Sequence, residues 1–181
     1  IQTSLVGSEM CIRDSCTTQH IDGIVNVTHP FSTTMGDHAQ QASSELGINY
    51  WRFLRPTWQQ KAGDDWRLFS TKEKLLRALF GYERALLTLG QVSPKELAFL
   101  KSDQHIWLRT AVQPTHPLPS HVNWIKAIGP FNEACELALL KQHHIQVIAS
   151  KNSGGSATEA KLTAARTLKV PVFMLQRPDI T

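Results

Sequence analysis

A loop with two adjacent glycines carries residues that are suited to hold an anionic group. It follows an apolar run and reads Lys151-Asn152-Ser153-Gly154-Gly155. The next segment has helical periodicity, and its Ser156 and Glu159 have the spacing of a capping box, so we expect the helix to begin directly after the glycines. Free N–H groups at a helix start attract phosphates and carboxylates, and the lysine adds charge. The alternative is a tight turn without a ligand, because the loop matches neither the Walker A pattern nor GxGxxG.

Two further junctions have the same order of apolar strand, loop and helix. The first carries Thr28 and His29, and the proline that follows restricts His29 to extended geometry. The second junction reads Gly129-Pro130-Phe131. Its glycine permits close approach of a ligand, and its proline suits the first position of a helix. Ligands of open α/β sheets bind at such strand ends, although each junction also has a structural explanation as the start of a helix.

Short apolar runs alternate with amphipathic segments along the chain. This pattern indicates parallel β/α units, and these units must position the residues above. We expect strands at 21–27, 50–54, 85–89, 106–111, 122–128, 145–149 and 172–175. We expect helices at 34–46, 71–82, 94–101, 130–142 and 157–168. Prolines and glycines place loops at 55–65 and 113–121. The carboxyl ends of the strands should therefore bring the junctions to the ligand edge of the sheets.

Composition excludes several classes of protein. The chain has 181 residues, of which 41% are apolar and 19% charged, which is enough apolar matter for a packed core. The basic residues are scattered, so the net charge of +4 suits an acidic ligand better than nucleic acid. No apolar run is long enough to span a membrane, and no metal-ligand spacing or hydrolytic triad is present. Three cysteines without a CxxC pair favour a reducing, cytoplasmic setting, and we expect a monomer.

The first residues of the chain differ from the rest. Residues 1–15 show neither strand alternation nor a helical stripe and look like translated sequencing adapter. We therefore expect a non-native or disordered segment that packs against nothing specific, with a natural N-terminal arm as the alternative. The remainder divides into a truncated first domain at 16–80 and a more complete second domain at 81–181, linked by 66–81.

Six short motifs occur in order along the chain: THPF at 28–31, RP-x-W at 55–58, GPF with an acid two residues on at 129–133, KNSGG at 151–155, KL-x-AA at 161–165 and RP at 177–178. As an ordered set they resemble the precorrin-6A reductases of cobalamin biosynthesis. The resemblance implies two Rossmann-like α/β domains with parallel sheets. The family's opening Gly-Gly-Thr-x-Glu loop has no match here, which implies that the first domain is incomplete at its N-terminus. Asn26 stands where family members commonly have aspartate.

The resemblance also implies a function. A hydride from NADPH, or from NADH in the cobalt-containing branch, would reduce one CH–CH type bond of a carboxylate-rich tetrapyrrole in a cleft between the domains. It assigns the cofactor to Thr28, His29 and residues 151–155. It assigns the substrate to Arg55, Gly129, Pro130, Phe131, Lys161 and Arg177. No catalytic residue is assigned, because hydride transfer is the chemistry of the cofactor and the protein supplies orientation and electrostatics.

Two other functions remain open at this point. A nucleotide- or anion-binding α/β module without chemistry would explain the glycine loop equally well, and a fragment that lacks its leading strand could be inactive. If the reductase interpretation holds, Thr28, Gly129 and Ser153 should meet at a common domain interface, because all three follow strands at the ligand edge of parallel sheets.

Overall fold

A computed structural model describes residues 9–178 of the chain. It divides into two compact units, Ile1–Arg55 with Pro178–Thr181 and Pro56–Arg177. The sequence placed the boundary near residue 80, which differs from this division. The reason is the strand β3 (Trp66–Phe69), which the sequence interpretation treated as a link and which pairs with β8 (Val172–Leu175) of the second unit. The two units are called unit 1 and unit 2 below.

Unit 1 is a small βαβ arrangement. Its parallel strands are β1 (Gly23–Asn26) and β2 (Asn49–Arg52), and the helix α2 (Thr33–Leu46) connects them. Ile24 and Tyr50 pack toward this helix and join Ala39 and Ala42 in a core. The helix ends at Gly47, whose φ of 67° gives the left-handed conformation that glycine adopts without strain.

A helix that the sequence did not predict, α1 (Glu9–Thr18), belongs to unit 1. Its Ile12 and Cys16 are buried and pack with Ala39 and Ala42 of α2. The expectation that 1–15 packs against nothing is therefore wrong for residues 9–15, while residues 1–8 lie outside the described part of the chain. The two buried residues are four positions apart, so they lie on one face of the helix about one turn apart. Two apolar residues are too few to give a recognisable helical periodicity in the sequence. A non-native origin of the segment stays a prediction.

Unit 2 contains a six-stranded parallel sheet in the order β3-β8-β7-β4-β5-β6. Its other strands are β4 (Arg84–Thr88), β5 (His105–Thr110), β6 (Val122–Lys126) and β7 (Val147–Lys151). The central strands read as apolar runs because both faces of a parallel sheet are covered by other elements. Leu86, Ile106 and Ile148 are fully buried there. The parallel α/β class predicted from the sequence is therefore confirmed.

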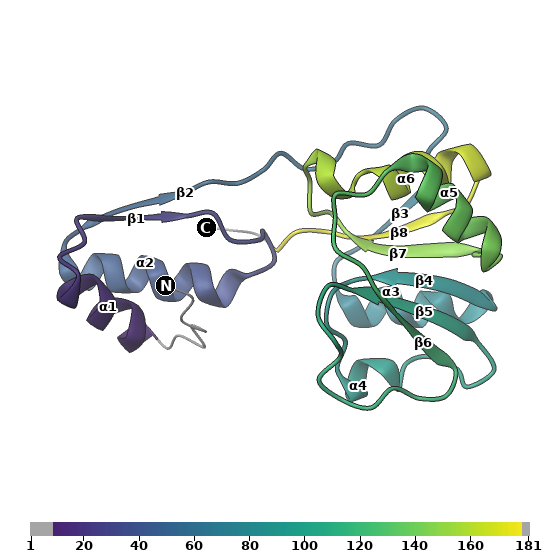
Figure 1. The fold of residues 1–181 in the computed structure, drawn as a ribbon, viewed down its shortest axis with the longest axis horizontal. Helices are drawn as coiled ribbons and strands as arrows, with labels where there is room; N and C mark the ends of the chain where they lie inside the picture. The colour runs from purple at the N-terminus through teal and green to yellow at the C-terminus, as the bar shows by residue number, and fades with distance from the viewer. Residues whose placement is uncertain (1–8, 179–181) are drawn as a thin grey trace. The chain divides into compact units, whose positions relative to one another are not determined.

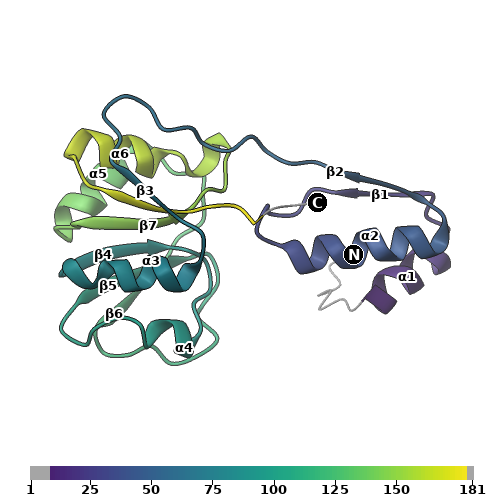
Figure 2. The ribbon, with the colours of Figure 1, turned by 180° about the vertical axis from the view of Figure 1, so that it is seen from behind.

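Helices cover the two faces of this sheet (Figures 1 and 2). The helices α5 (Glu133–Gln142) and α6 (Ala160–Leu168) pack together, and α3 (Lys72–Ala78) packs with α4 (Pro94–Leu97) on the other face. Two 3-10 turns, η1 (Leu79–Gly81) and η2 (Ser156–Thr158), complete the elements of unit 2. None of the helices between residues 9 and 178 combines the length and apolar character that a membrane span requires.

The chain order sets where unit 2 can bind a ligand. From β4 the chain moves outward through β5 to β6, and it then returns to the other side of β4 to form β7 and β8. The direction of winding thus reverses between β4 and β7. In open α/β sheets, the crevice at the carboxyl ends of such strands is the usual ligand site.

Candidate functional site

The loops that follow β4 and β7 meet at this reversal point. Thr88 Oγ1 donates to Ala149 O at 3.0 Å, which ties the two strand ends together. Gly90, with φ of 76°, lies beside Lys151, and a β-carbon at Gly90 would be 3.3 Å from Lys151 Nζ. The lysine head group therefore occupies space that only a glycine leaves open. The sequence interpretation named Lys151 but missed Gly90, although its place directly after an apolar strand was a usable signal.

A second lysine and a glutamate add charge near Lys151. Lys72, the first residue of α3, donates to Gln91 O at 3.2 Å and pairs with Glu96 at 2.9 Å. Burial lowers the pKa of Lys151, and the positive charge of Lys72 lowers it further. Two ammonium groups and one carboxylate thus leave a net positive charge at the carboxyl ends of β4 and β7. Such a place favours a phosphate or carboxylate.

We call residues 151–158 the ligand loop, and its first half is held by the segment that enters unit 2. Asn152 Oδ1 accepts from Trp58 N at 2.9 Å, and Asn152 Nδ2 donates to Trp58 O at 3.2 Å. Trp58 Nε1 donates to Gly155 O at 2.9 Å. Arg177 donates to Asn152 O at 2.8 Å and to Ser153 O at 2.9 Å. The side chains of Asn152 and Arg177 therefore shape the loop from inside unit 2.

The glycines of the loop have distinct conformations. Gly154 is buried with φ of 68°, and a β-carbon there would overlap the carbonyl oxygen of Pro56. Gly155 has φ of 80°. Positive φ values at both positions explain why the sequence has glycine twice. At Gly154, the missing side chain allows close approach of another part of the same chain, the carbonyl group of Pro56, rather than of a ligand.

The helix after the loop starts later than expected. The capping box expected at Ser156 and Glu159 is not formed in the described structure, where η2 occupies Ser156–Thr158 and α6 begins at Ala160. Glu159 instead pairs with Lys61 at 2.9 Å. A contact with a residue 98 positions away thus replaces the local cap. The first N–H groups of α6 are consequently separated from the glycines by the 3-10 turn.

The loop at 129–131 lies against the ligand loop. Phe131 N donates to Ala157 O at 2.9 Å, and a β-carbon at Gly129 would be 3.2 Å from the same oxygen. The peptide bond between Gly129 and Pro130 is cis, and Pro130 is exposed. The expected helix start at Pro130 is wrong, because Asn132 caps α5 by accepting from Cys135 N at 2.8 Å.

Lys161, which the resemblance assigned to the substrate, lies inside unit 2 with 4% of its surface exposed. Its Nζ donates to Thr158 O at 2.7 Å and lies 4.6 Å from the centroid of the Trp58 ring. Burial lowers the pKa of Lys161 to about 7, helped by the charge of Arg109 and opposed by that of Glu136. Arg109 and Glu136 form a buried ion pair with two hydrogen bonds.

In unit 1, the residues near the carboxyl end of β1 form a local turn. Thr28 N donates to Asn26 Oδ1 at 3.0 Å, and Phe31 N donates to His29 Nδ1 at 3.2 Å. Asn26 Nδ2 donates to Tyr50 Oη at 2.8 Å. Asn26 is buried and has a partner at both ends of its amide, whereas Thr28 and His29 are half-buried.

Two polar atoms near these strand ends have unused hydrogen-bonding capacity. Among residues 9–178, Thr28 Oγ1 and Arg52 Nη2 are buried and have no hydrogen-bond partner. Arg52 pairs in register with Asn26, and its guanidinium lies over Gly36 of α2, 3.0 Å from where a β-carbon would be. Buried polar atoms normally have partners, so these two atoms are suited to meet a ligand. Arg55, which ends the first segment of unit 1, is half-buried.

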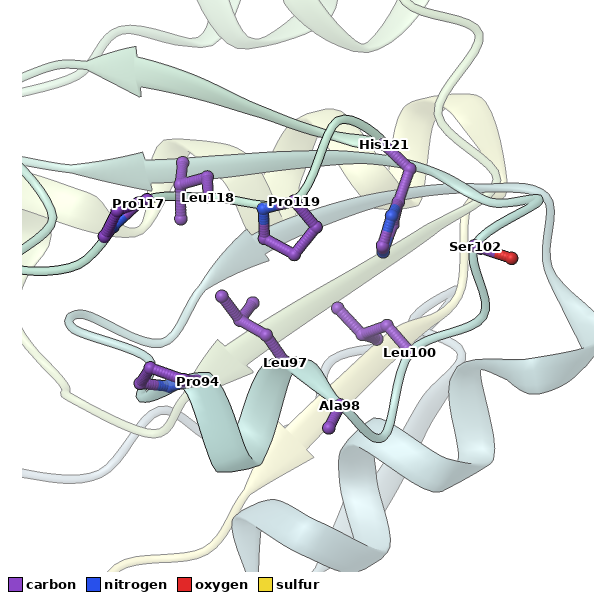
Figure 3. Close-up of a pocket in the computed structure, with 9 residues that line it drawn as sticks. All are labelled: Pro94, Leu97, Ala98, Leu100, Ser102, Pro117, Leu118, Pro119 and His121. Carbon is purple, nitrogen blue, oxygen red and sulfur yellow. The ribbon is translucent and has the colours of Figure 1, made fainter.

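A separate hollow of about 450 Å³ lies on another part of unit 2 (Figure 3). Leu97, Leu100, Leu118 and Pro119 form apolar walls between α4 and the chain that leads into β6, and His121 lies at one end. None of the residues that line it belongs to the ligand loop. It therefore contributes nothing to the charged site at β4 and β7.

These features define a class of protein. A doubly wound parallel sheet, with a lysine and a close glycine contact at the reversal point, is a Rossmann-like α/β arrangement, in which this edge is the usual place for a ligand. The expected meeting of Thr28 with Gly129 and Ser153 stays a prediction, because Thr28 belongs to unit 1 and the other two belong to unit 2.

Comparisons with known proteins identify the family. The model of the family "Precorrin-6x reductase CbiJ/CobK" matches residues 3–181. The chain is 36% identical over 171 residues to a precorrin-6A reductase of Rhodococcus erythropolis, covering 91% of this chain and 67% of that protein. It is 36% identical over 162 residues to a precorrin-6A reductase of Mycobacterium tuberculosis, covering 88% and 65%. The chain therefore belongs to the precorrin-6x reductase CbiJ/CobK family.

A solved structure titled CobK precorrin-6A reductase is similar with a TM-score of 0.88 and 30% identity, over 97% of this chain and 70% of that one. A cobalt-precorrin-6A reductase of Methanothermobacter thermautotrophicus is 27% identical over 169 residues, covering 87% of this chain and 55% of that protein. This chain thus spans about two thirds or less of the length of these three curated relatives.

Proposed function

We propose that this chain takes part in the reduction of one carbon–carbon double bond of precorrin-6A, a step of cobalamin biosynthesis, with a nicotinamide nucleotide as the hydride donor. Family membership supports the reductase hypothesis over a binding module without chemistry. The relatives named precorrin-6A reductase are more similar to this chain than the cobalt-precorrin relative, which supports the cobalt-free substrate. NADPH is the donor that the family resemblance implies for that substrate.

The single observation that carries this proposal at the level of residues is Lys151 at the carboxyl ends of β4 and β7. Its Nζ lies over Gly90, 3.3 Å from where a β-carbon would be, so the glycine leaves space for the ammonium at this edge of the sheet. Its charge fits a phosphate of the nucleotide, and nucleotides bind at this place in doubly wound sheets. We therefore assign Lys151 and Ser153 to the phosphates of the cofactor. When bound, the cofactor supplies the hydride.

The other expected site residues take different parts in this proposal. Thr28 Oγ1 remains assigned to the cofactor and His29 shapes the turn beside it. Arg55 remains assigned to substrate carboxylates, and we add Arg52, whose Nη2 is buried without a partner among the described residues. Asn152, Gly154 and Arg177 hold the ligand loop in shape. Gly129 and Phe131 support the loop through Ala157.

The setting and assembly belong to the same proposal. We keep the reducing, cytoplasmic setting as part of the proposal, because the sequence has three cysteines and no CxxC pair. A monomer without nucleic acid stays a prediction.

Lys151→Ala tests the proposed site. Loss of one charge-assisted hydrogen bond should weaken NADPH binding by about 1.5–3 kcal/mol, roughly 10- to 150-fold in Kd. Lys126→Ala is a matched control, because Lys126 is also the last residue of a strand of this sheet and is exposed. Calorimetric titration of both variants with NADPH measures the difference. Equal Kd values for Lys151→Ala, Lys126→Ala and the unchanged protein would show that Lys151 does not bind the cofactor.

Activity is measured by following the absorbance of precorrin-6A in the presence of NADPH or NADH. Consumption of NADPH with a matching change in the macrocycle spectrum is the expected result. Binding of NADPH without reduction of the macrocycle would favour the binding module instead.

A further inference from the structure

One buried amino group contacts the end of the ligand loop and a side chain that holds the loop. Lys161 Nζ donates to Thr158 O at 2.7 Å, at the end of the 3-10 turn that follows the glycines. The same Nζ lies 4.6 Å from the centroid of the Trp58 ring. Trp58 in turn contacts the loop through Asn152 and Gly155. Lys161 therefore connects both halves of the loop to one point inside unit 2.

This arrangement costs stability, because a charged amine is buried with 4% of its surface exposed. The charged groups that act on it are Arg109 of β5 and Glu136 of α5, and they already satisfy each other as a buried ion pair. An apolar side chain of similar length would avoid the desolvation. What the lysine provides and an apolar residue cannot is a donor for Thr158 O.

We propose that Lys161 is a positioning residue for the ligand loop, which it fixes by donating to Thr158 O and by packing its amino group against Trp58. The inference rests on the proposed function of the loop as the phosphate site. Because Lys161 is buried, it acts through Thr158 and Trp58 and does not contact the ligand itself.

The charge of Lys161 makes loop closure depend on pH. Its pKa is about 7 in the closed structure, whereas a lysine that opening exposes to water returns toward the ordinary value of 10.5. Between these values the open state binds a proton that the closed state lacks, so the closed state gains stability as pH rises from about 7. Below that pH both states are protonated, and closure carries the full cost of the buried charge. The loop should be held more firmly at pH 9 than at pH 7.

Amide hydrogen exchange across residues 151–158, measured between pH 6 and pH 9 and corrected for the intrinsic rate, tests this. In the unchanged protein, protection should rise above pH 7 by up to about tenfold per pH unit, the limit for one linked proton. Lys161→Met removes donor and charge, and Lys161→Gln keeps a donor without charge. Both variants should lose this pH dependence. Lys141→Met, which removes an exposed lysine from α5, is the control and should keep it.

Binding of NADPH separates positioning from stability alone. Lys161→Met should raise the melting temperature near pH 7, yet weaken NADPH binding by about tenfold, because Thr158 O loses its donor. Lys161→Gln should bind NADPH within about threefold of the unchanged protein. Equal NADPH affinity in all three proteins, or exchange in residues 151–158 that does not vary with pH in the unchanged protein, would overturn the proposal.

Two outcomes need separate interpretation. If Lys161→Met does not fold, two results still test the proposal. They are the pH dependence of exchange in the unchanged protein and the loss of that dependence in Lys161→Gln. If the unchanged protein does not bind NADPH at any pH, the proposed function fails. The exchange profile then supports or overturns the control of the loop by Lys161 without reference to the cofactor.

Discussion

At the scale of single residues, some side chains of the ligand loop hold the protein's own backbone, and we propose others for the ligand. Asn152 places both ends of its amide on the backbone of Trp58, and Gly154 lies where a side chain would overlap Pro56. Lys151 has its head group at the carboxyl ends of β4 and β7, over Gly90. Neighbouring residues of one motif thus have different tasks, and a motif alone does not distinguish them.

Gly154→Ala should destabilise unit 2 more than Gly63→Ala does. Both glycines have positive φ, which costs a residue with a β-carbon about 1–2 kcal/mol. At Gly63 the new methyl would meet only the flexible side chain of Arg166 at 3.3 Å, whereas at Gly154 it would overlap the Pro56 carbonyl. We expect a total loss of about 2–5 kcal/mol for Gly154→Ala. Urea unfolding of both variants gives the comparison, and equal losses would show that the contact with Pro56 is easily relieved.

At the scale of elements, the two-stranded sheet of unit 1 has two different faces. Alternate residues of β1 and β2, such as Ile24 and Tyr50, pack toward α2. The alternate set includes two exposed apolar residues, Val25 with 62% and Trp51 with 55% of its surface exposed. Phe53, directly after β2, is 63% exposed. A strand pair with apolar residues on both faces is typical of a sheet that is covered on both sides. An exposed patch of this kind favours association.

Replacing this patch should change association without changing the fold of unit 1. The double variant Val25→Thr, Trp51→Thr places a β-branched residue of high strand propensity at both exposed positions. Its free energy of unfolding should therefore stay within about 0.5 kcal/mol of that of the unchanged protein. Light scattering at high protein concentration should show less self-association. Ile24→Thr, on the covered face, is the contrasting variant and should lower stability. If the double variant lowers stability as much as Ile24→Thr, the patch is part of a core.

At the scale of the whole molecule, unit 2 contains the parts from which the ligand loop is built. Trp58, Lys161 and Arg177, which hold the loop, all lie within Pro56–Arg177, and so does Gly90. β3 brings the start of this unit to the edge of the sheet beside β8. These contacts to the loop therefore come from within unit 2.

A chain of residues 56–177 should fold by itself and keep the ligand loop. Its amide NMR spectrum should match the corresponding signals of the full chain, because the sheet and its buried core lie within this range. Calorimetry of the full chain should show a separate transition for unit 1, which has a much smaller core. Poor signal dispersion for 56–177 would contradict the assignment of an independent unit.

Local pattern was enough for several features of this protein. The apolar runs at 85–89, 106–111 and 145–149 predicted the central strands of a parallel sheet, because burial on both faces demands continuous apolar sequence. The position of Lys151 at the end of such a run was enough to predict its place at the carboxyl edge of the sheet. Strand periodicity and the order of strand, loop and helix are local properties, and the sequence contains them directly.

Only the tertiary structure decided which parts of the motifs meet. Trp58 and Asn152 are 94 residues apart, and their hydrogen bonds depend on β3 adding to the edge of the sheet. Lys161 looks like a surface lysine beside a helical stripe, yet the packing of Trp58 over it makes it buried. Pairing of distant segments is set by the packing of the whole core. The sequence by itself therefore determined the class of fold and the edge of the sheet at which the three junctions lie. Tertiary packing determined which of their side chains are used to hold the protein's own loops.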